Sequence, residues 1–424
     1  MTPEIEQRIE QIRRGEVPEG YEKKRTVVIP QQWRLPQIKD IASISSGSTP
    51  NRNNSEYWNG NIPWVTTGEL SSGHVNHTSE LITVKAVKEA KMRIYPQGTL
   101  LMAMYGQGKT RGTVAILEID AAVNQACAAI TVKDGKSKFL FYQLKNSYQD
   151  IRKLSNTGNQ ENLNADIIKT YQVPWAPDEE QERISTILTT QDRVIELKEK
   201  RLAEKQRQKK YLMQQLLTGK KRLPGFSGEW KNIKLCEVLS ERKEKNVEQN
   251  LRICSVAVLK GVVDQVEHLG RSYAANDTSN YSVAHYGDII YTKSPTGDFL
   301  YGIVKQNLLQ ETVAVSPLYG VFTPMTFGLG YFLHTYFQSA ICARNYLLPI
   351  VQKGAKNTIN ITNDTFISSK LYLPLDVEEQ KAIADTFIAA DREIDLLQQD
   401  IEQEKQKKKA LMQLLLTGVV RVTI

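Results

Sequence analysis

The feature that most constrains this chain is an internal repeat, in which residue i aligns with residue i + 199 without a gap. Residues 179–222 and 378–421 are identical at 18 of 44 aligned positions. The identical positions include Asp192 and Asp391, and both segments contain Leu-Leu-Thr-Gly near their ends. Self-similarity at a fixed offset indicates two copies of one structural unit.

Each repeated segment is predicted to form one long helix. Apolar residues recur at steps of three and four, and a Thr-Gly pair marks the end of each helix. About 40 residues make a helix of roughly 60 Å. Neither apolar stripe is buried by its own helix, so we expect the two helices to pair with each other as a coiled coil. The stripe residues are Ile184, Leu188, Ile195, Leu202, Leu212 and Leu216 in the first helix and Ile383, Phe387, Ile394, Leu397, Ile401, Leu411 and Leu415 in the second. Gln191, Lys198, Lys205 and Lys209 interrupt the first stripe and are expected to weaken it.

The regions before the two helices also correspond, although more weakly. Trp33 parallels Trp230, and residues 98–101 parallel residues 287–290. The expected fold is α+β, with two pseudo-repeated domains separated by two long antiparallel coiled-coil helices. The predicted divisions are a helical lead-in (1–32), a first domain (33–176), a long helix with the start of a linker (177–222), a second domain (223–376) and a second long helix (377–424). Strands are predicted over 112–119 and 282–291, and one helix in each domain over 139–153 and 330–344.

Composition restricts the class of protein without deciding it. The formal charge of +8 and the pI near 9.0 suit a polyanionic partner. Four cysteines, at positions 127, 236, 254 and 342, match neither a zinc spacing nor a disulfide framework. Neither a signal peptide nor an apolar stretch long enough to span a membrane is evident. We therefore expect a cytoplasmic protein without a membrane partner.

Several short motifs suggest chemistry, but each has a simpler explanation. Residues 103–110 match the phosphate-binding pattern A-x-x-x-x-G-K-T, yet residues 111–116 have a strand pattern where a phosphate site needs a helix. A hairpin turn is the favoured interpretation, and a nucleotide site is the alternative. His74 and His77 lack nearby cysteines, so a polar turn is favoured over a metal site. We expect no catalytic residues and no bound metal in this chain.

Other motifs resemble a known family. The first domain contains Ser46-Gly47-Ser48-Thr49-Pro50 and the stretch Tyr57–Val65, YWNGNIPWV, and it ends with Gly158-Asn159-Gln160. Together with the EEQ and LLTG of each helix, these residues are similar to the specificity subunit of type I restriction-modification enzymes. The second domain lacks the G-x-T-P and W-x-G elements and has residues 315–322, VSPLYGVF, like another class of such domains.

The resemblance implies a DNA-recognition subunit without catalytic activity. Each domain would recognise one half of an interrupted, asymmetric sequence in double-stranded DNA, and the helices would set the gap and bind two methylation subunits. Restriction subunits are further possible partners. This chain would need no cofactor, since the partners would bring S-adenosylmethionine, ATP and magnesium. A non-catalytic coiled-coil scaffold is the alternative from another class.

DNA contacts are expected from loops that combine glycine with donors and acceptors of hydrogen bonds. The candidates in the first domain are Ser48, Thr49, Asn51, Arg52, Thr66, Thr67, Lys109, Thr110 and Arg111. Those in the second domain are Lys293, Ser294, Thr296, Lys305, Lys353, Lys356, Asn357 and Thr358.

Overall fold

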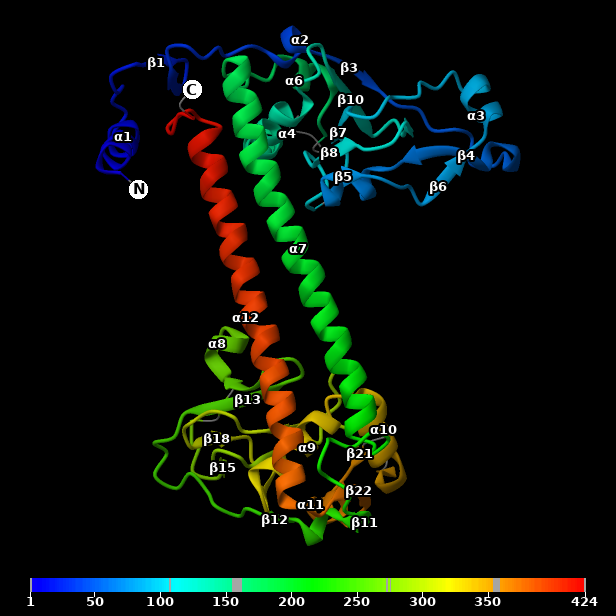
Figure 1. Ribbon diagram of the computed structural model, residues 1–424, viewed down its shortest axis with the longest axis vertical. Helices are drawn as coiled ribbons and strands as arrows, with labels where there is room; N and C mark the ends of the chain where they lie inside the picture. Colours follow the sequence, from blue (N-terminus) through cyan, green and yellow to red (C-terminus); the bar gives the residue numbers. More distant parts are fainter. Residues whose placement is uncertain are drawn as a thin grey trace. The chain divides into compact units, whose positions relative to one another are not determined.

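The structure is a computed structural model that describes residues 2–106, 108–154, 162–271, 274, 276–353 and 359–422 (Figure 1). The chain forms two compact units, Met1–Lys198 with Asp400–Ile424 (unit 1) and Glu199–Gln399 (unit 2). Each unit combines one domain with part of both long helices, α7 (Asp178–Leu216) and α12 (Val377–Leu415). Within the described residues, no helix is both long enough and apolar enough to cross a membrane.

The domain of unit 1 contains short strands and helices. The lead-in consists of α1 (Pro3–Arg13), β1 (Tyr21–Lys24) and β2 (Val27–Pro30). The remaining strands are β3 (Ala42–Ser46), β4 (Trp58–Val65), β5 (His74–Val75), β6 (Glu80–Ile82), β7 (Leu100–Ala103), β8 (Val114–Leu117), β9 (Ala122–Val123) and β10 (Cys127–Val132). The helices are α2 (Ile38–Ile41), η1 (Ser55–Tyr57), η2 (Thr67–Ser72), α3 (Val84–Glu89), α4 (Ser137–Asn146), α5 (Tyr148–Lys153) and α6 (Ala165–Thr170).

The domain of unit 2 is built in a similar way. Its strands are β11 (Trp230–Lys234), β12 (Leu239–Glu241), β13 (Ile253–Ala257), β14 (Gly261–Asp264), β15 (Ser282–Ala284), β16 (Ile289–Tyr291), β17 (Val304–Gln306), β18 (Val313–Val315), β19 (Gly320–Pro324), β20 (Gln352–Lys353), β21 (Ile359–Asn360) and β22 (Lys370–Pro374). Its helices are η3 (Leu235–Glu237), α8 (Gln265–Leu269), α9 (Phe327–Tyr336), α10 (Ala340–Leu347), η4 (Leu348–Ile350) and α11 (Asn363–Ser368).

The two domains share the order of their main sheet. Unit 1 has the order β3-β10-β7-β8, with β5 added at the edge, and unit 2 has β12-β19-β16-β17. All neighbouring strands in these two four-stranded arrangements are antiparallel. A second sheet follows in each domain, β6-β4-β9 in unit 1 and β14-β13-β18-β15 in unit 2, and each contains one parallel pair. The weak sequence correspondence therefore reflects a common topology.

Three predicted segments within the domains need correction. The segment 139–153 forms two helices, α4 and α5, which meet at Ser147, and the segment 330–344 falls within α9 and α10, which Phe337–Ser339 separate. Residues 282–291 are two strands, β15 and β16, joined by a turn. In that turn Asp288 accepts a hydrogen bond from the His285 amide, 2.8 Å away, which fixes the reversal of the chain. Apolar periodicity does not detect such short breaks.

The apolar stripe of the long helices packs against the domains as well as between the helices. In unit 1, Ile184, Leu188 and Leu415 belong to the same core cluster as Phe139 and Trp33. In unit 2, Leu216, Ile383 and Phe387 belong to the domain core, and Leu212 packs against it. Ile195, Leu397 and Ile401 are buried, whereas Leu202, Ile394 and Leu411 are half-buried. Each domain is therefore fixed to both helices by a continuous apolar core.

Polar contacts continue the pairing of the helices where the stripe is interrupted. All four polar residues that interrupt the stripe of α7 bond α12. The pairs are Gln191–Glu404, Lys198–Asp400 and Lys198–Glu404 in unit 1 and Lys205–Glu393 and Lys209–Asp391 in unit 2. Partner numbers fall along α12 as they rise along α7, so the helices are antiparallel, as predicted. These contacts add to the pairing at the positions where the apolar stripe is weakened, because each polar residue has a partner on the opposite helix.

A buried glutamate joins each domain to the beginning of one helix. Glu180 accepts a hydrogen bond from the Trp33 indole at 2.9 Å and forms an ion pair with Arg421 at 2.8 Å. Glu379 accepts a hydrogen bond from the Trp230 indole at 3.1 Å and pairs with Arg222. Both carboxylates are almost fully buried. Because a buried charge is costly unless it is paired and hydrogen-bonded, this repeated contact explains the second glutamate of each EEQ.

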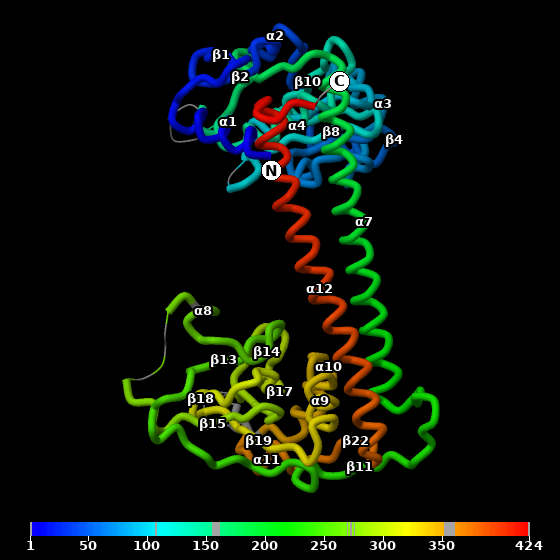
Figure 2. The backbone as a smooth tube through the Cα atoms, turned by 60° about the vertical axis from the view of Figure 1, so that its left-hand side comes forward, coloured from blue at the N-terminus to red at the C-terminus, as the bar shows by residue number. Residues whose placement is uncertain are grey.

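The two ends of the chain meet in unit 1. Figure 2 shows the two ends near each other. The Tyr21 hydroxyl donates to the Gly418 carbonyl at 2.7 Å, and Arg8 donates to the Val419 carbonyl at 2.8 Å. Gly418 has a left-handed backbone (φ 74°), as does Gly219 (φ 68°) at the same place in the repeat. The predicted glycine stops of both helices are therefore confirmed.

Candidate nucleic-acid interface

The motif residues of the first domain build a small lobe around two tryptophans. The Trp64 indole donates to the Ser48 carbonyl at 3.1 Å, and the Trp58 indole donates to the Asn51 carbonyl at 3.3 Å. The guanidinium of Arg52 lies over both rings, 4.2 Å and 4.9 Å from their centroids. Both of its terminal nitrogens also bond the carboxylate of Glu80. Arg52, predicted as a DNA contact, thus holds this lobe together.

The glycines of the same motifs are required by close backbone contacts. A Cβ on Gly47 would lie 2.0 Å from the Val123 carbonyl oxygen, and a Cβ on Gly60 would lie 2.3 Å from that of Ile82. Neither distance is compatible with a side chain. The G-x-T-P and W-x-G patterns are therefore signatures of the lobe's fold, whereas Thr49 is exposed at its surface.

Thr66 and Thr67 lie at the beginning of η2. The Thr66 amide donates to the Glu69 carboxylate at 2.7 Å in a capping box, and Thr67 is half-buried. The histidines next to this helix have separate partners, Glu118 for His74 and Asn76 for His77. In the described part of the chain, no three histidine, cysteine or acidic residues gather as a metal site would require.

The motif with the phosphate-binding pattern forms a turn between antiparallel strands. Residues 108–112 are turn residues between β7 and β8, and no helix begins at Lys109. A phosphate site of this kind needs the free amides of a helix N-terminus, so the hairpin interpretation is confirmed. The Lys109 carbonyl accepts hydrogen bonds from the hydroxyls of Tyr148 (2.6 Å) and Thr113 (3.1 Å). The backbone of the turn is therefore fixed, while the Lys109 side chain is exposed.

The neighbouring candidates are less accessible. Thr110 is half-buried, and Arg111 is only 7% exposed. The Arg111 carbonyl accepts a hydrogen bond from Arg152 at 2.7 Å. Arg111 lies in a turn, as predicted, but it is little open to DNA because the turn packs against α5. Lys109 is the member of this group whose charge faces solvent.

The corresponding turn of unit 2 joins β16 to β17. Lys293 stands at its beginning with a left-handed backbone (φ 58°), and its half-buried position lowers the pKa of its ammonium group. A lysine in this conformation is strained, and strained residues cluster at functional sites. Ser294 and Thr296 are exposed. Thus both sets of turn candidates, 109–111 and 293–296, lie at equivalent places in the two domains.

Lys305 requires correction. It lies on β17 and is 3% exposed, so it is not a loop residue open to DNA. Burial and the nearby Lys209 lower the pKa of its ammonium group to about 8, whereas Asp391 opposes this shift. Lys305 also lines a cavity of about 230 Å³ with His334 and Asp391. All three residues of β17 are buried, although two of them are polar, so the sequence pattern does not indicate that Lys305 is buried.

The last group of candidates cannot be placed. Lys356, Asn357 and Thr358 lie outside the described residues, as does the Gly158-Asn159-Gln160 motif of the first domain. Lys353 belongs to β20, whose backbone pairs with β21. These residues remain predictions from the sequence.

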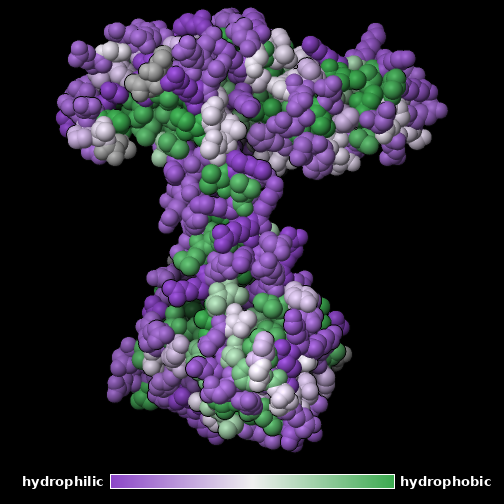
Figure 3. Space-filling view, in the orientation of Figure 1, coloured by the Kyte–Doolittle hydropathy of each residue, from purple (hydrophilic) through white to green (hydrophobic). Residues whose placement is uncertain are grey.

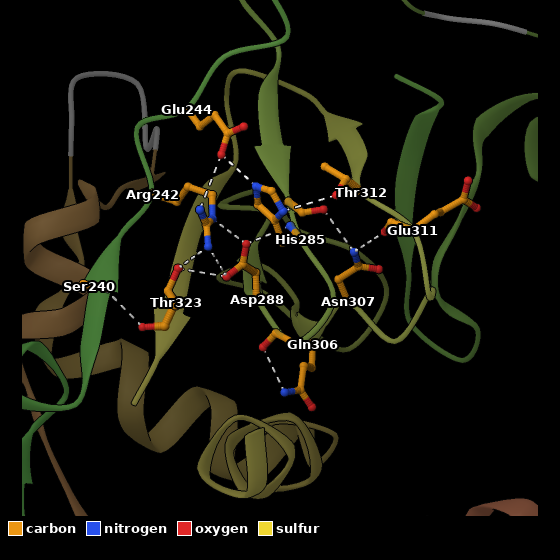
Figure 4. A network of polar contacts seen from close by, with 12 residues as sticks. Ser240, Arg242, Glu244, His285, Asp288, Gln306, Asn307, Glu311, Thr312 and Thr323 are labelled. Atoms are coloured by element: carbon orange, nitrogen blue, oxygen red, sulfur yellow. Dashed lines mark hydrogen bonds and ion pairs between the residues drawn. The ribbon is translucent and has the colours of Figure 1, made fainter. Parts of the chain in front are cut away.

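A polar network that the sequence analysis missed supports the second domain (Figure 4). The buried carboxylate of Asp288 receives hydrogen bonds from Arg242 (2.6 Å), the Thr323 hydroxyl (2.9 Å) and the His285 amide (2.8 Å). His285 in turn bonds Glu244 at 2.7 Å. The network connects the ends of several strands, so it fixes the sheet from which the turn at Lys293 projects. The sequence gives one sign of this network. Gly287-Asp288 occupies the position in the second domain that Gly98-Thr99 occupies in the first.

Comparison with known proteins now decides the family. The family model described as "Type I restriction modification DNA specificity domain" matches residues 30–206 and 229–406. The chain belongs to this family. The two matches correspond to the two copies of the repeat, so the resemblance inferred from the motifs is confirmed.

Individual members of the type I specificity family agree with this assignment. The MjaIX specificity subunit of Methanocaldococcus jannaschii is 35% identical over 178 residues, which are 41% of this chain and 40% of that relative. The MjaVIII specificity subunit of the same organism is 23% identical over 95% of this chain and 96% of its own length. The type I S subunit of M. genitalium has the same fold, with a TM-score of 0.58 at 11% identity over 93% of this chain and 98% of that one.

Proposed function

We propose that this protein is the sequence-specificity subunit of a type I restriction-modification complex. Each unit recognises one half of an interrupted DNA target, and the long helices set the gap between the halves. The single observation that best supports this proposal is the pair of family matches, one on each repeat. The protein itself is not an enzyme in this proposal, and it acts in the cytoplasm.

The proposed DNA interface includes the two equivalent turns, β7–β8 and β16–β17. Lys109 and Lys293 supply positive charge there, and Ser294 and Thr296 supply hydroxyl groups. Phosphate contacts position a protein on DNA, and side chains that reach base edges give specificity. Because the residues of the two turns differ, the proposal predicts two different half-sites and hence an asymmetric target.

The long helices are the proposed binding surface for two methylation subunits. Leu197 and Leu396 are at equivalent positions in the repeat, and about half of each side chain is exposed. The space-filling view shows small hydrophobic areas on the helices among hydrophilic residues (Figure 3). Leu197 belongs to unit 1 and Leu396 to unit 2, so each unit offers one of these exposed leucines to one methylation subunit. S-adenosylmethionine, ATP and magnesium would belong to methylation and restriction subunits and not to this chain.

The proposal is tested by co-expressing the chain with the methylation subunit of its own host and mapping methylated adenines across the genome. We expect one interrupted motif that appears only when this chain is present. If methylation is the same without the chain, the proposed function is rejected. The scaffold alternative has no specific support, since it leaves two folded domains without a role.

A further inference from the structure

The turns β7–β8 and β16–β17 occupy the same place in the shared strand order, but their exposed charged side chains have opposite signs. The exposed side chain of Lys109 gives the first turn a cation. Asp298, which is also exposed, gives the second turn an anion. Among the residues that the structure describes, neither charged group has a hydrogen-bonding or ion-pair partner. A difference of this kind at equivalent positions predicts a difference in what the turns bind.

The tip that presents Asp298 is rigid. Thr296 and Phe299 exchange two backbone hydrogen bonds of 3.0 Å, which leaves Gly297 and Asp298 as a two-residue turn. Gly297 has a left-handed backbone (φ 54°), as the first position of a type II′ turn requires. Phe299 is buried in the core of unit 2. Asp298 is therefore held in one place on a turn that is fixed to the core.

A carboxylate at a DNA surface has restricted chemistry. It repels phosphates, and it can only accept hydrogen bonds. The major-groove edge of cytosine offers the N4 amino group as a donor, and acidic side chains accept from it. A lysine donates instead to the O6 and N7 acceptors of guanine. The two turns thus differ in the base that each can recognise.

We propose that Asp298 recognises the N4 amino group of a cytosine in the half-site bound by unit 2. The inference rests on the proposed function and extends it to one residue and one base. The alternative is that Asp298 is only a solvated turn residue. In that case a mutation of Asp298 would not change the sequence preference.

The test uses the full chain, co-expressed with the methylation subunit of its host, and maps methylated adenines for each variant. The Asp298→Asn variant is expected to methylate the wild-type motif at least about tenfold less, because a contact of this kind discriminates by roughly that factor or more. A carboxamide pairs best with adenine, so one position of one half-site should change from cytosine toward adenine. The other half-site and the gap should stay the same.

Two further variants make the result specific. Asp298→Glu keeps an acceptor and should retain cytosine at that position, whereas Glu267→Gln removes an exposed acid of unit 2 outside the turn and should leave the motif unchanged. The inference is overturned if Asp298→Asn methylates the wild-type motif as well as the wild-type chain does, or if Asp298→Glu loses cytosine as Asp298→Asn does. A wild-type chain that adds no methylated motif would instead reject the proposed function itself.

Discussion

Asp192 on α7 forms an ion pair with Lys408 on α12, and the repeat places the same pair in the other unit, where Asp391 on α12 binds Lys209 on α7. In both units a tyrosine of the domain also donates to the aspartate. Tyr142 lies 2.8 Å from Asp192, and Tyr331 lies 2.9 Å from Asp391. One repeated contact therefore joins the domain to both helices in each unit.

This contact predicts similar losses of stability from equivalent mutations. Asp192→Asn and Asp391→Asn should each lower the free energy of unfolding by about 1–3 kcal/mol, because each leaves a largely buried lysine without its charge partner. Denaturant unfolding of the full chain measures the loss. Combining Asp192→Asn with Lys408→Met should recover part of it, since the unpaired charge is then gone. Additive losses in the double variant would show that the two residues are not coupled.

The glycines of the first-domain lobe give a second prediction. Gly47→Ala and Gly60→Ala should each cost about 1–3 kcal/mol or more, because the new methyl group would overlap a backbone carbonyl of the neighbouring strand. Gly228→Ala is the matched control, since a Cβ there has nothing within 4 Å and the backbone is not left-handed. Thermal unfolding compares the three variants. Equal melting temperatures would contradict the close packing of the lobe.

The fold could be predicted from the sequence where the chemistry is periodic or repeated. The stripe from Ile184 to Leu216 predicted a long helix, and the repeat predicted its partner. The break at Ser147 and the turn that contains Asp288 could not be predicted, because apolar periodicity does not detect such short interruptions. The sequence also did not predict which residues far apart in the chain contact one another.

The candidate site could likewise be predicted only in part. The turn at Lys109 was placed correctly, because glycines and a following strand pattern mark a hairpin. Arg52 and Lys305 were treated as free charges, because the sequence gives no sign of the Glu80 carboxylate beside one or of the burial of the other. The sequence does not single out Asp298, because no local pattern distinguishes it from the other acidic residues of a basic chain. Asp298 becomes a candidate once the structure shows that its turn is equivalent to the turn that contains Lys109.

His334 gives a prediction for pH dependence. Burial, together with the nearby Lys305 and Lys209, lowers its pKa from 6.5 to about 3, and Asp391 lies on the same cavity. The unfolded chain therefore binds a proton below pH 6.5 that the folded chain does not bind. Stability should fall as the pH falls, by about 2 kcal/mol from pH 6.5 to pH 5. Urea unfolding at both pH values should show a smaller fall for His334→Gln, whereas an equal fall would remove His334 as the cause.

The exposed leucines of the long helices predict where methylation subunits bind. Leu197→Asp and Leu396→Asp should each weaken binding at least about tenfold, because a charge would be buried at the interface without a partner. Their melting temperatures should stay close to that of the wild-type chain. Leu259→Asp changes a leucine that is 96% exposed outside the helices and serves as the control. Titration calorimetry with the purified methylation subunit measures all three, and unchanged binding would place the interface elsewhere.

Each unit is expected to recognise its own half of the target. The most direct measurement is to replace residues 33–176 with the corresponding domain of a relative that has a different target, and to map methylated adenines with the host methylation subunit. We expect one half-site to change to that of the relative, while the other half-site stays the same. A change in both half-sites, or in neither, would contradict it.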